Sequence, residues 1–215
     1  MALTANNSKK QFPPIEAGTH QAVCFGIIDL GTQENEWNNE TKDVHQILIL
    51  WEIPSLTYEI DDKGAKKILT KTISKTYTLS LGEKAKLRAD LTSWRGVPFT
   101  EDELERFDVF NVLGANCILQ IIHVKKGDKT YANISSVMAL MKGMPSLKPV
   151  RPTVKYSMEE SGCLLPDGIP DWIVTKIKSS KEYQSETSMH DESQESDGSP
   201  EWNGPTEEPE DKPPF

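Results

Sequence analysis

The sequence has too few cysteines, placed too far apart, to form a disulfide scaffold or a zinc ribbon. Cys24, Cys117 and Cys163 include no CxxC pair, so we expect reduced thiols. No apolar run approaches the roughly 18–20 residues that cross a bilayer. The first 14 residues lack the apolar core of a signal peptide. These absences predict a cytoplasmic protein with no membrane partner.

The sequence also lacks the short motifs that mark catalytic and metal sites. It contains no GxxxxGK[ST] phosphate loop, no GxSxG nucleophile elbow and no HExxH zinc motif. The four histidines are isolated, and the carboxylates at 101–108 are typical of the acidic first turn of a helix. We therefore expect no catalytic residue, no metal and no cofactor, and hence a protein that is not an enzyme.

Charge is divided unevenly along the chain. The sequence has 24 Lys and Arg against 33 Asp and Glu, a net charge of −9. Residues 182–215 contain eleven acids and one base, which leaves residues 1–181 with a net charge of +1. Eight bases and two acids give residues 63–90 a charge of +6. A basic body with an acidic tail favours a polyanionic partner.

Composition divides the chain into four parts. Residues 1–14 are polar and end in two prolines, which predicts a disordered arm. Residues 15–140 contain nearly all the periodic apolar segments and form the expected domain. Residues 141–181 begin with a proline-rich linker and continue into a short helical extension, in which Trp172, Ile173, Lys176 and Ile177 are spaced to give one apolar face. Residues 182–215 have too few large apolar side chains to offset chain entropy, so we expect a disordered acidic tail.

The apolar periodicity of residues 15–140 predicts a mainly β domain. The strand patterns cover residues 18–31, 44–53, 67–81, 116–125 and 129–140. A polar loop is expected at 32–43 and a helix over 83–94, and Thr100 with Glu103 forms a capping-box pattern for a second short helix. Three strands, a helix and two strands match the five-stranded oligonucleotide/oligosaccharide-binding (OB) barrel, which has a helix between strands three and four.

Aromatic and basic residues are interleaved around the predicted third strand. Unpaired nucleic acid is held by Lys and Arg on its phosphates and by aromatic rings stacked on its bases. In an OB barrel the groove crosses strands two and three between two loops. The candidate DNA-binding residues are Trp37, Tyr58, Lys66, Lys67, Lys71, Lys75, Tyr77, Lys125, Lys126, Lys129 and Tyr131. The competing interpretation is that these lysines only solubilise the sheet, and that Tyr77 and Tyr131 belong to the core.

The last residues combine acids, prolines and a terminal aromatic residue. Such a tip offers a ring to an apolar pocket and a carboxylate to a basic residue, and its prolines reduce the entropy lost on docking. The candidate partner-binding residues are Glu210, Asp211, Pro213, Pro214 and Phe215.

Several stretches resemble known single-stranded DNA-binding proteins. The ending EDKPPF is similar to the acidic Pro-Phe tip of the bacterial proteins, although Lys212 and a second proline depart from the usual pattern. The body resembles a bacteriophage single-stranded DNA-binding protein of the OB class. The residues that suggest this are LRADLTSWRGVPFTEDELERFD (87–108), GDKTYANISSVMAL (127–140) and GIPDWIVTKIKSS (168–180).

The resemblance implies coating of single-stranded DNA, without sequence preference, during phage DNA replication, recombination or repair. It implies a location in the host cytoplasm and a tail that recruits replication or recombination proteins; self-association stays open. The alternative function is of another class: a phage structural or interaction protein whose acidic tail acts as a DNA mimic.

Overall fold

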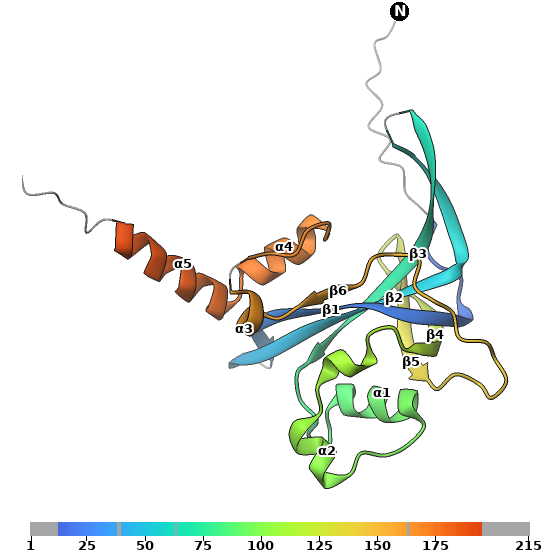
Figure 1. Ribbon diagram of the computed structural model, residues 1–215, viewed down its shortest axis with the longest axis horizontal. Helices are drawn as coiled ribbons and strands as arrows, with labels where there is room; N and C mark the ends of the chain where they lie inside the picture. Colours follow the sequence, from blue (N-terminus) through green and yellow to red (C-terminus); the bar gives the residue numbers. More distant parts are fainter. Residues whose placement is uncertain (1–12, 38–39, 63, 163, 195–215) are drawn as a thin grey trace, which may run out of the picture.

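The structure is a computed structural model that describes residues 13–37, 40–62, 64–162 and 164–194 (Figure 1). Its strands are β1 (Gly18–Trp37), β2 (Glu40–Asp62), β3 (Ala65–Thr78), β4 (Asn116–Lys126), β5 (Lys129–Met138) and β6 (Val154–Tyr156). Its helices are α1 (Lys86–Arg95), α2 (Glu101–Arg106), the 3₁₀ helix η1 (Val109–Val112), α3 (Met158–Ser161), α4 (Asp171–Lys178) and α5 (Lys181–Gln194). Among the described residues, no helix is both long and apolar enough to span a membrane.

The main sheet is a strongly curled antiparallel half-barrel with the strand order β3-β2-β1-β4-β5. β1 joins its two halves, because residues 18–23 pair with β4 and residues 23–37 pair with β2. Register shifts at Cys24/Gly26 and Asp29/Gly31 interrupt the β1–β2 ladder, and bulges of this kind increase bending. Within the described chain, no ladder joins β3 to β5, so the sheet is open between its two terminal strands.

The sequence predictions of a mainly β chain, of five strands and of a helix between the third and fourth strands are confirmed. Local signals also hold. Thr100 Oγ1 accepts from the Glu103 N–H while the Glu103 carboxylate accepts from the Thr100 N–H, the expected capping box. Gly96 ends α1 in the left-handed conformation, at a φ of 71°, which glycine adopts without steric cost.

The polar loop predicted at 32–43 is wrong, because β1 and β2 continue through most of it. The ladder runs from Thr32↔His45 to Trp37↔Glu40. This hairpin lacks an apolar face, and so its sequence shows no strand alternation. Glu34 lies directly opposite Asp43, a repulsive pair that Lys181 of α5 neutralises at 3.6 Å and 2.7 Å respectively.

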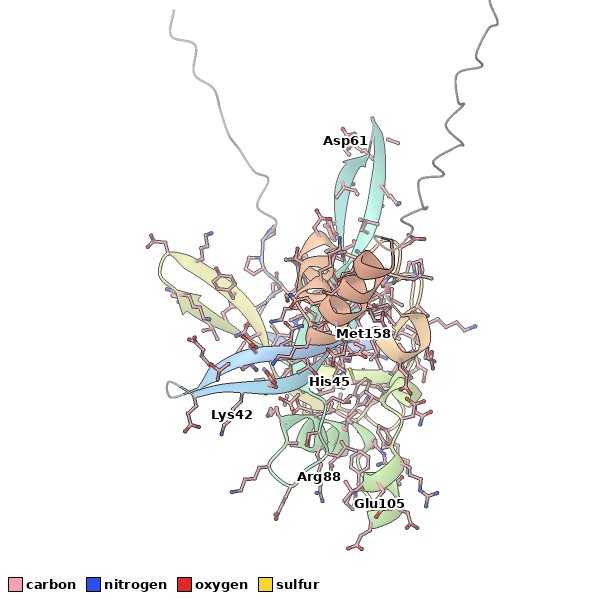
Figure 2. The ribbon with its side chains drawn as sticks, turned by 90° about the vertical axis from the view of Figure 1, so that its left-hand side faces the viewer. Lys42, His45, Asp61, Arg88, Glu105 and Met158 are labelled. Atoms are coloured by element: carbon pink, nitrogen blue, oxygen red, sulfur yellow. The ribbon has the colours of Figure 1, made fainter. Side chains whose placement is uncertain are left out.

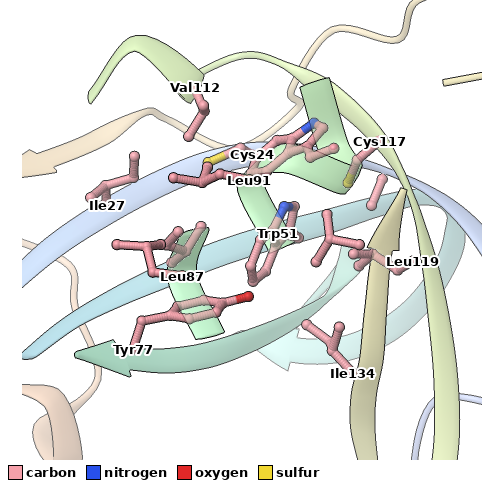
Figure 3. Close-up of a cluster of buried hydrophobic side chains, with 14 of the residues drawn as sticks. Cys24, Ile27, Trp51, Tyr77, Leu87, Leu91, Val112, Cys117, Leu119 and Ile134 are labelled. Carbon is pink, nitrogen blue, oxygen red and sulfur yellow. The ribbon is translucent and has the colours of Figure 1, made fainter. Parts of the chain in front are cut away.

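The concave face of the half-barrel holds the larger apolar core (Figure 3). Trp51 from β2 packs against Trp94 from α1, with ring centroids 5.7 Å apart, and Leu87 and Leu91 bury the same helix face. Cys24 and Cys117 are free thiols within this core. Burial raises the pKa of Cys24 to about 12, so its thiol is protonated and unreactive at neutral pH.

The convex face of β1 and β2 is covered by the C-terminal extension. Ile173 and Ile177 of α4 and Tyr156 of β6 form a second buried cluster whose sheet residues are Phe25, Ile28, Leu30, Leu48 and Leu50. β6 pairs in parallel with Gly26–Ile28. This strand was not predicted from the sequence. Both faces of β1 and β2 are therefore buried, which explains their nearly continuous apolar runs.

The start of α5 is anchored on β1 and β2. The tail was expected to be disordered from residue 182, but residues 182–194 belong to α5; residues 195–215 lie outside the described part. The Glu182 carboxylate accepts from the Thr32 N–H at 2.7 Å and from Thr32 Oγ1 at 2.5 Å. Gly31, at a φ of 66°, permits this approach, because a Cβ there would lie 2.6 Å from Ser180 Cβ.

His45 connects Glu182 to a second carboxylate. Its Nε2 lies 2.7 Å from Asp29 Oδ1, and its Nδ1 lies 3.8 Å from Glu182 Oε1. The hydrogen bond to Asp29 raises the pKa of His45 above its usual value, with burial opposing this and both carboxylates adding to it. Burial opposes ionisation of Asp29 and Glu182, but hydrogen bonds outweigh it, and the pKa of each carboxyl is lowered.

We expect this anchor to be strongest in mildly acidic solution. Because the pKa of His45 is raised by folding, its stabilising contribution is complete below about pH 6.5 and is lost as the pH rises through the raised pKa. The contributions of Asp29 and Glu182 are lost only as the pH falls through their lowered pKa values, below about pH 4. The thermal midpoint should therefore decrease as the pH rises above about 6.5 and through the raised pKa of His45. His45→Gln, measured in parallel, should flatten this decrease; an identical profile in the variant would contradict the role given to His45.

Candidate nucleic-acid interface

The gap between β3 and β5 forms a groove of about 350 Å³, here called the β3–β5 groove. Tyr58 from β2, Lys71 from β3 and Tyr131 from β5 line it. Three of the candidate DNA-binding residues, on three different strands, therefore lie around one cavity. The other lining residues are Pro13, Pro14, Ile15, Thr72, Ile73, Thr130 and Ala132. Among these described residues there is no carboxylate, an arrangement that suits an anionic, aromatic ligand.

Residues 13–15 lie beside the β3–β5 groove and are hydrogen-bonded to β3 and to β4. Lys71 Nζ donates to the Pro13 carbonyl at 3.3 Å, and His123 Nε2 donates to the Ile15 carbonyl at 2.8 Å. Ile15 is buried in the main core. The prolines that were expected to end a disordered arm therefore form one wall of the β3–β5 groove, and the hydrogen bond holds Lys71 in place.

Lys75 and Tyr77 do not line the groove, although they share a face of β3 with Lys71. Tyr77 is 3% exposed, and its hydroxyl donates to Asp90 Oδ2 at 2.9 Å. Lys75 Nζ lies 2.6 Å from the same oxygen, and the side chains of Lys75 and Asp90 are 19% and 8% exposed. Burial and the Asp90 charge raise the pKa of Tyr77. The same strand face enters the core as the sheet curls, so we exclude both residues from the interface.

The β2–β3 hairpin is less basic than the sequence window suggested. Lys66 pairs with Glu59 at 3.5 Å, and it lies opposite Asp61 in the ladder. The window with a charge of +6 begins at residue 63, just after these acids. In the folded hairpin the acids lie beside lysines of β3, so the net positive charge of the hairpin is lower than that of the window. Lys67 lies opposite Ile60 and so shares a strand face with Tyr58, which makes it the better candidate of the two adjacent lysines.

The β4–β5 hairpin provides the more basic flank. Lys125, Lys126 and Lys129 are exposed around a turn at Gly127, and no ion pair to a described carboxylate involves any of them. Tyr131, 45% exposed, follows on the same strand. Figure 2 shows this yellow hairpin and the teal β2–β3 hairpin, labelled at Asp61, diverging from the body. The β3–β5 groove lies between them.

The structure places two tryptophans differently from the prediction made from the sequence. Trp37 pairs with Glu40, the first residue of β2, whereas Tyr58 lies near the other end of that strand; the side chain of Trp37 lies outside the described part. Trp172 was assigned to the apolar face of a helix. Ile173 and Ile177 form that face, and Trp172 is 53% exposed. Trp172 is one position, about 100° around the helix, from Ile173, so the spacing alone did not decide which of the two residues is buried.

A second surface has the opposite character. A groove of about 440 Å³, here called the acidic groove, lies where η1, α3 and α5 meet β1 and β2. Its ionisable lining residues are Asp29, His45, Asp108, Glu159, Glu182 and Glu186. The described residues contain no group of His, Cys, Asp and Glu that could hold a metal ion. The candidate partner-binding residues at 210–215 lie outside the described part.

No protein-family model matches the chain, and no curated protein matches it in sequence.

Substitution of Lys75 and of Lys71 by Met should separate the structural lysine from the groove lysine. Lys75→Met leaves the buried Asp90 carboxylate with only Tyr77 and the exposed Lys86, 3.5 Å away, and should lower the free energy of unfolding by about 2 kcal/mol. Lys71→Met should change it by less than about 0.5 kcal/mol. Urea denaturation of both variants tests this, and equal losses would contradict the different environments assigned to them.

Proposed function

We propose that this chain binds single-stranded DNA without sequence preference, as a non-enzymatic protein of phage DNA replication, recombination or repair. The observation that supports it best is the β3–β5 groove, where Tyr58, Lys71 and Tyr131 surround a cavity without a described carboxylate. Rings that stack on bases and lysines that contact phosphates are the two elements that binding of unpaired strands requires.

The curled sheet supports an OB-like assignment within this proposal. β1 pairs with both β2 and β4, and α1 lies between β3 and β4 in the chain, as in an OB barrel. The groove lies at the opening between β3 and β5, where a fully closed barrel would have a ladder. The β4–β5 hairpin flanks this opening as the loop between strands four and five does in the OB mode of oligonucleotide binding, whereas the other flank is the β2–β3 hairpin in place of the β1–β2 loop.

The acidic C-terminal segment has a separate role in this proposal, which is to recruit replication or recombination proteins through Glu210, Asp211, Pro213, Pro214 and Phe215. The support is the sequence itself: Glu210 and Asp211 precede two prolines and an aromatic residue.

Salt dependence tests the electrostatic part of the proposal. If Lys67, Lys71, Lys125, Lys126 and Lys129 each neutralise one phosphate, log affinity for poly-dT should fall with log salt at a slope of about −3.5, at roughly −0.7 per contact. Titration at several salt concentrations, followed by anisotropy of a labelled oligonucleotide, measures the slope. A slope indistinguishable from zero would remove the groove hypothesis.

Two substitutions should change different parameters of the same titration. Tyr131→Ala should weaken binding by about tenfold with little change of slope, because base stacking is worth about 1–3 kcal/mol and releases no counterions. Lys71→Met should reduce the magnitude of the slope by about 0.7. Leu79→Ala is the matched control, since Leu79 is exposed to a similar degree as Tyr131 but lines the acidic groove. Equal effects of Tyr131→Ala and Leu79→Ala would contradict the site.

A second function is favoured by one observation. Five carboxylates line the acidic groove, in agreement with an interaction protein that presents negative charge to a basic partner. This alternative predicts no binding of single-stranded oligonucleotides at any salt concentration, and so the titrations above distinguish it from the first function.

A further inference from the structure

A third groove lies on the opposite face of β3 from the β3–β5 groove. Its volume is about 310 Å³, and we call it the α4 groove because Ile169, Pro170 and Trp172 at the start of α4 form one side. Phe25 and Leu50 form its floor. As in the β3–β5 groove, its described lining includes no carboxylate, and its charged member is Arg151. In a chain with 33 acids, two neighbouring grooves without a described acid form a distinct surface.

The two grooves meet at the edge of β3. Thr72 and Ile73 line both of them, and β3 is a terminal strand of the sheet, with a ladder only to β2. No described strand covers this edge, so an extended ligand can pass from one face of β3 to the other at Thr72. The two cavities are thus consecutive parts of one path around the edge strand.

Arg151 is held rigidly beside this path. The N–H groups of Val150 and Arg151 donate to the Glu52 carboxylate at 2.8 Å and 2.9 Å, and Glu52 is fully buried. The guanidinium donates through Nη2 to the Thr70 carbonyl at 2.7 Å and through Nε to Thr70 Oγ1 at 3.3 Å. Fixing the side chain in advance reduces the entropy that it would lose on binding a phosphate.

Trp172 presents an aromatic surface at the far end of the path. Its indole is 53% exposed, whereas Trp51 and Trp94 are buried in the main core. Its neighbour Ile173 is fully buried, which fixes the backbone that carries the ring. An exposed indole on a rigid helix, next to a fixed guanidinium and a polar strand edge, combines the groups that bind unpaired nucleotides.

We infer that single-stranded DNA continues from the β3–β5 groove over the edge of β3 into the α4 groove, where Trp172 stacks on a base and Arg151 contacts a phosphate. This inference rests on the proposed function and extends it, because it adds a second binding segment and predicts a longer footprint than one groove would give.

Oligonucleotide length provides the test. Wild-type protein and Trp172→Ala are titrated with labelled dT oligomers from about 5 to about 30 nucleotides, which span the site sizes of OB folds. The shortest oligomers should bind both proteins equally, because they fill only the β3–β5 groove. The longest should bind Trp172→Ala about tenfold more weakly, from the loss of one stacked base. Trp172→Phe should retain most of the affinity while losing the quenching of tryptophan fluorescence that DNA causes in the wild type.

Leu164→Ala is the matched control, because Leu164 is an exposed apolar residue of the same extension that does not line the α4 groove. Equal affinities of wild type and Trp172→Ala at every length would overturn the inference and leave the proposed function intact. A uniform loss at all lengths would also overturn it, since the indole would then act on the first groove or on the fold. Failure of the wild type to bind any oligomer would instead refute the proposed function.

Discussion

Burial of β1 and β2 on both faces decides which parts of the sheet remain available to a ligand. The concave face is filled by α1 through Leu87, Leu91 and Trp94, and the convex face is covered by α4 through Ile173 and Ile177. Covering both faces leaves few side chains of β1 and β2 accessible, so most of the proposed ligand contacts come from β3, β5 and the edges of the sheet. The β3–β5 groove and the α4 groove both occur there, on either side of the edge strand β3.

Asp90 defines where β3 stops being a binding surface. One face of this strand changes from the open groove at Lys71 to the core at Tyr77 within six residues, because the sheet curls over α1. A lysine entering that interior needs a counter-charge, and Asp90 supplies it to Lys75 while also accepting from Tyr77. The buried carboxylate thus converts two apparent DNA contacts into structural groups, and it fixes the position of α1 under the sheet.

Local structure could be predicted from the sequence, but the curvature of the sheet and the contacts between residues far apart in the chain could not. Alternation in β3, the capping box at Thr100 and the stop at Gly96 depend on neighbouring residues, and all three were predictable. Whether the side chains of Lys71 and Tyr77 are exposed or buried depends on how strongly the sheet curls. The alternation of apolar and polar residues along a strand does not predict this curvature. The strand extension through 32–43 places Glu34 opposite Asp43, and the lysine that neutralises this pair, Lys181, lies far along the chain. Of the candidate DNA-binding residues, the structure brings Tyr58, Lys71 and Tyr131 together around one groove.

The anchor of α5 places Glu182 and Glu186 at a distance from the β3–β5 groove. Glu182 binds Thr32 and His45 where the β1–β2 hairpin emerges, and Figure 1 shows α5 on the opposite side of the molecule from the β2–β3 hairpin. Fixed charges interact strongly only within about one Debye length, roughly 8 Å at physiological salt. Carboxylates held at the start of α5 therefore leave the field of the β3–β5 groove to Lys71 and the β4–β5 lysines. A freely attached acidic segment beginning beside the groove would cancel that field, so the α5 anchor has an electrostatic consequence beyond the contacts that it makes.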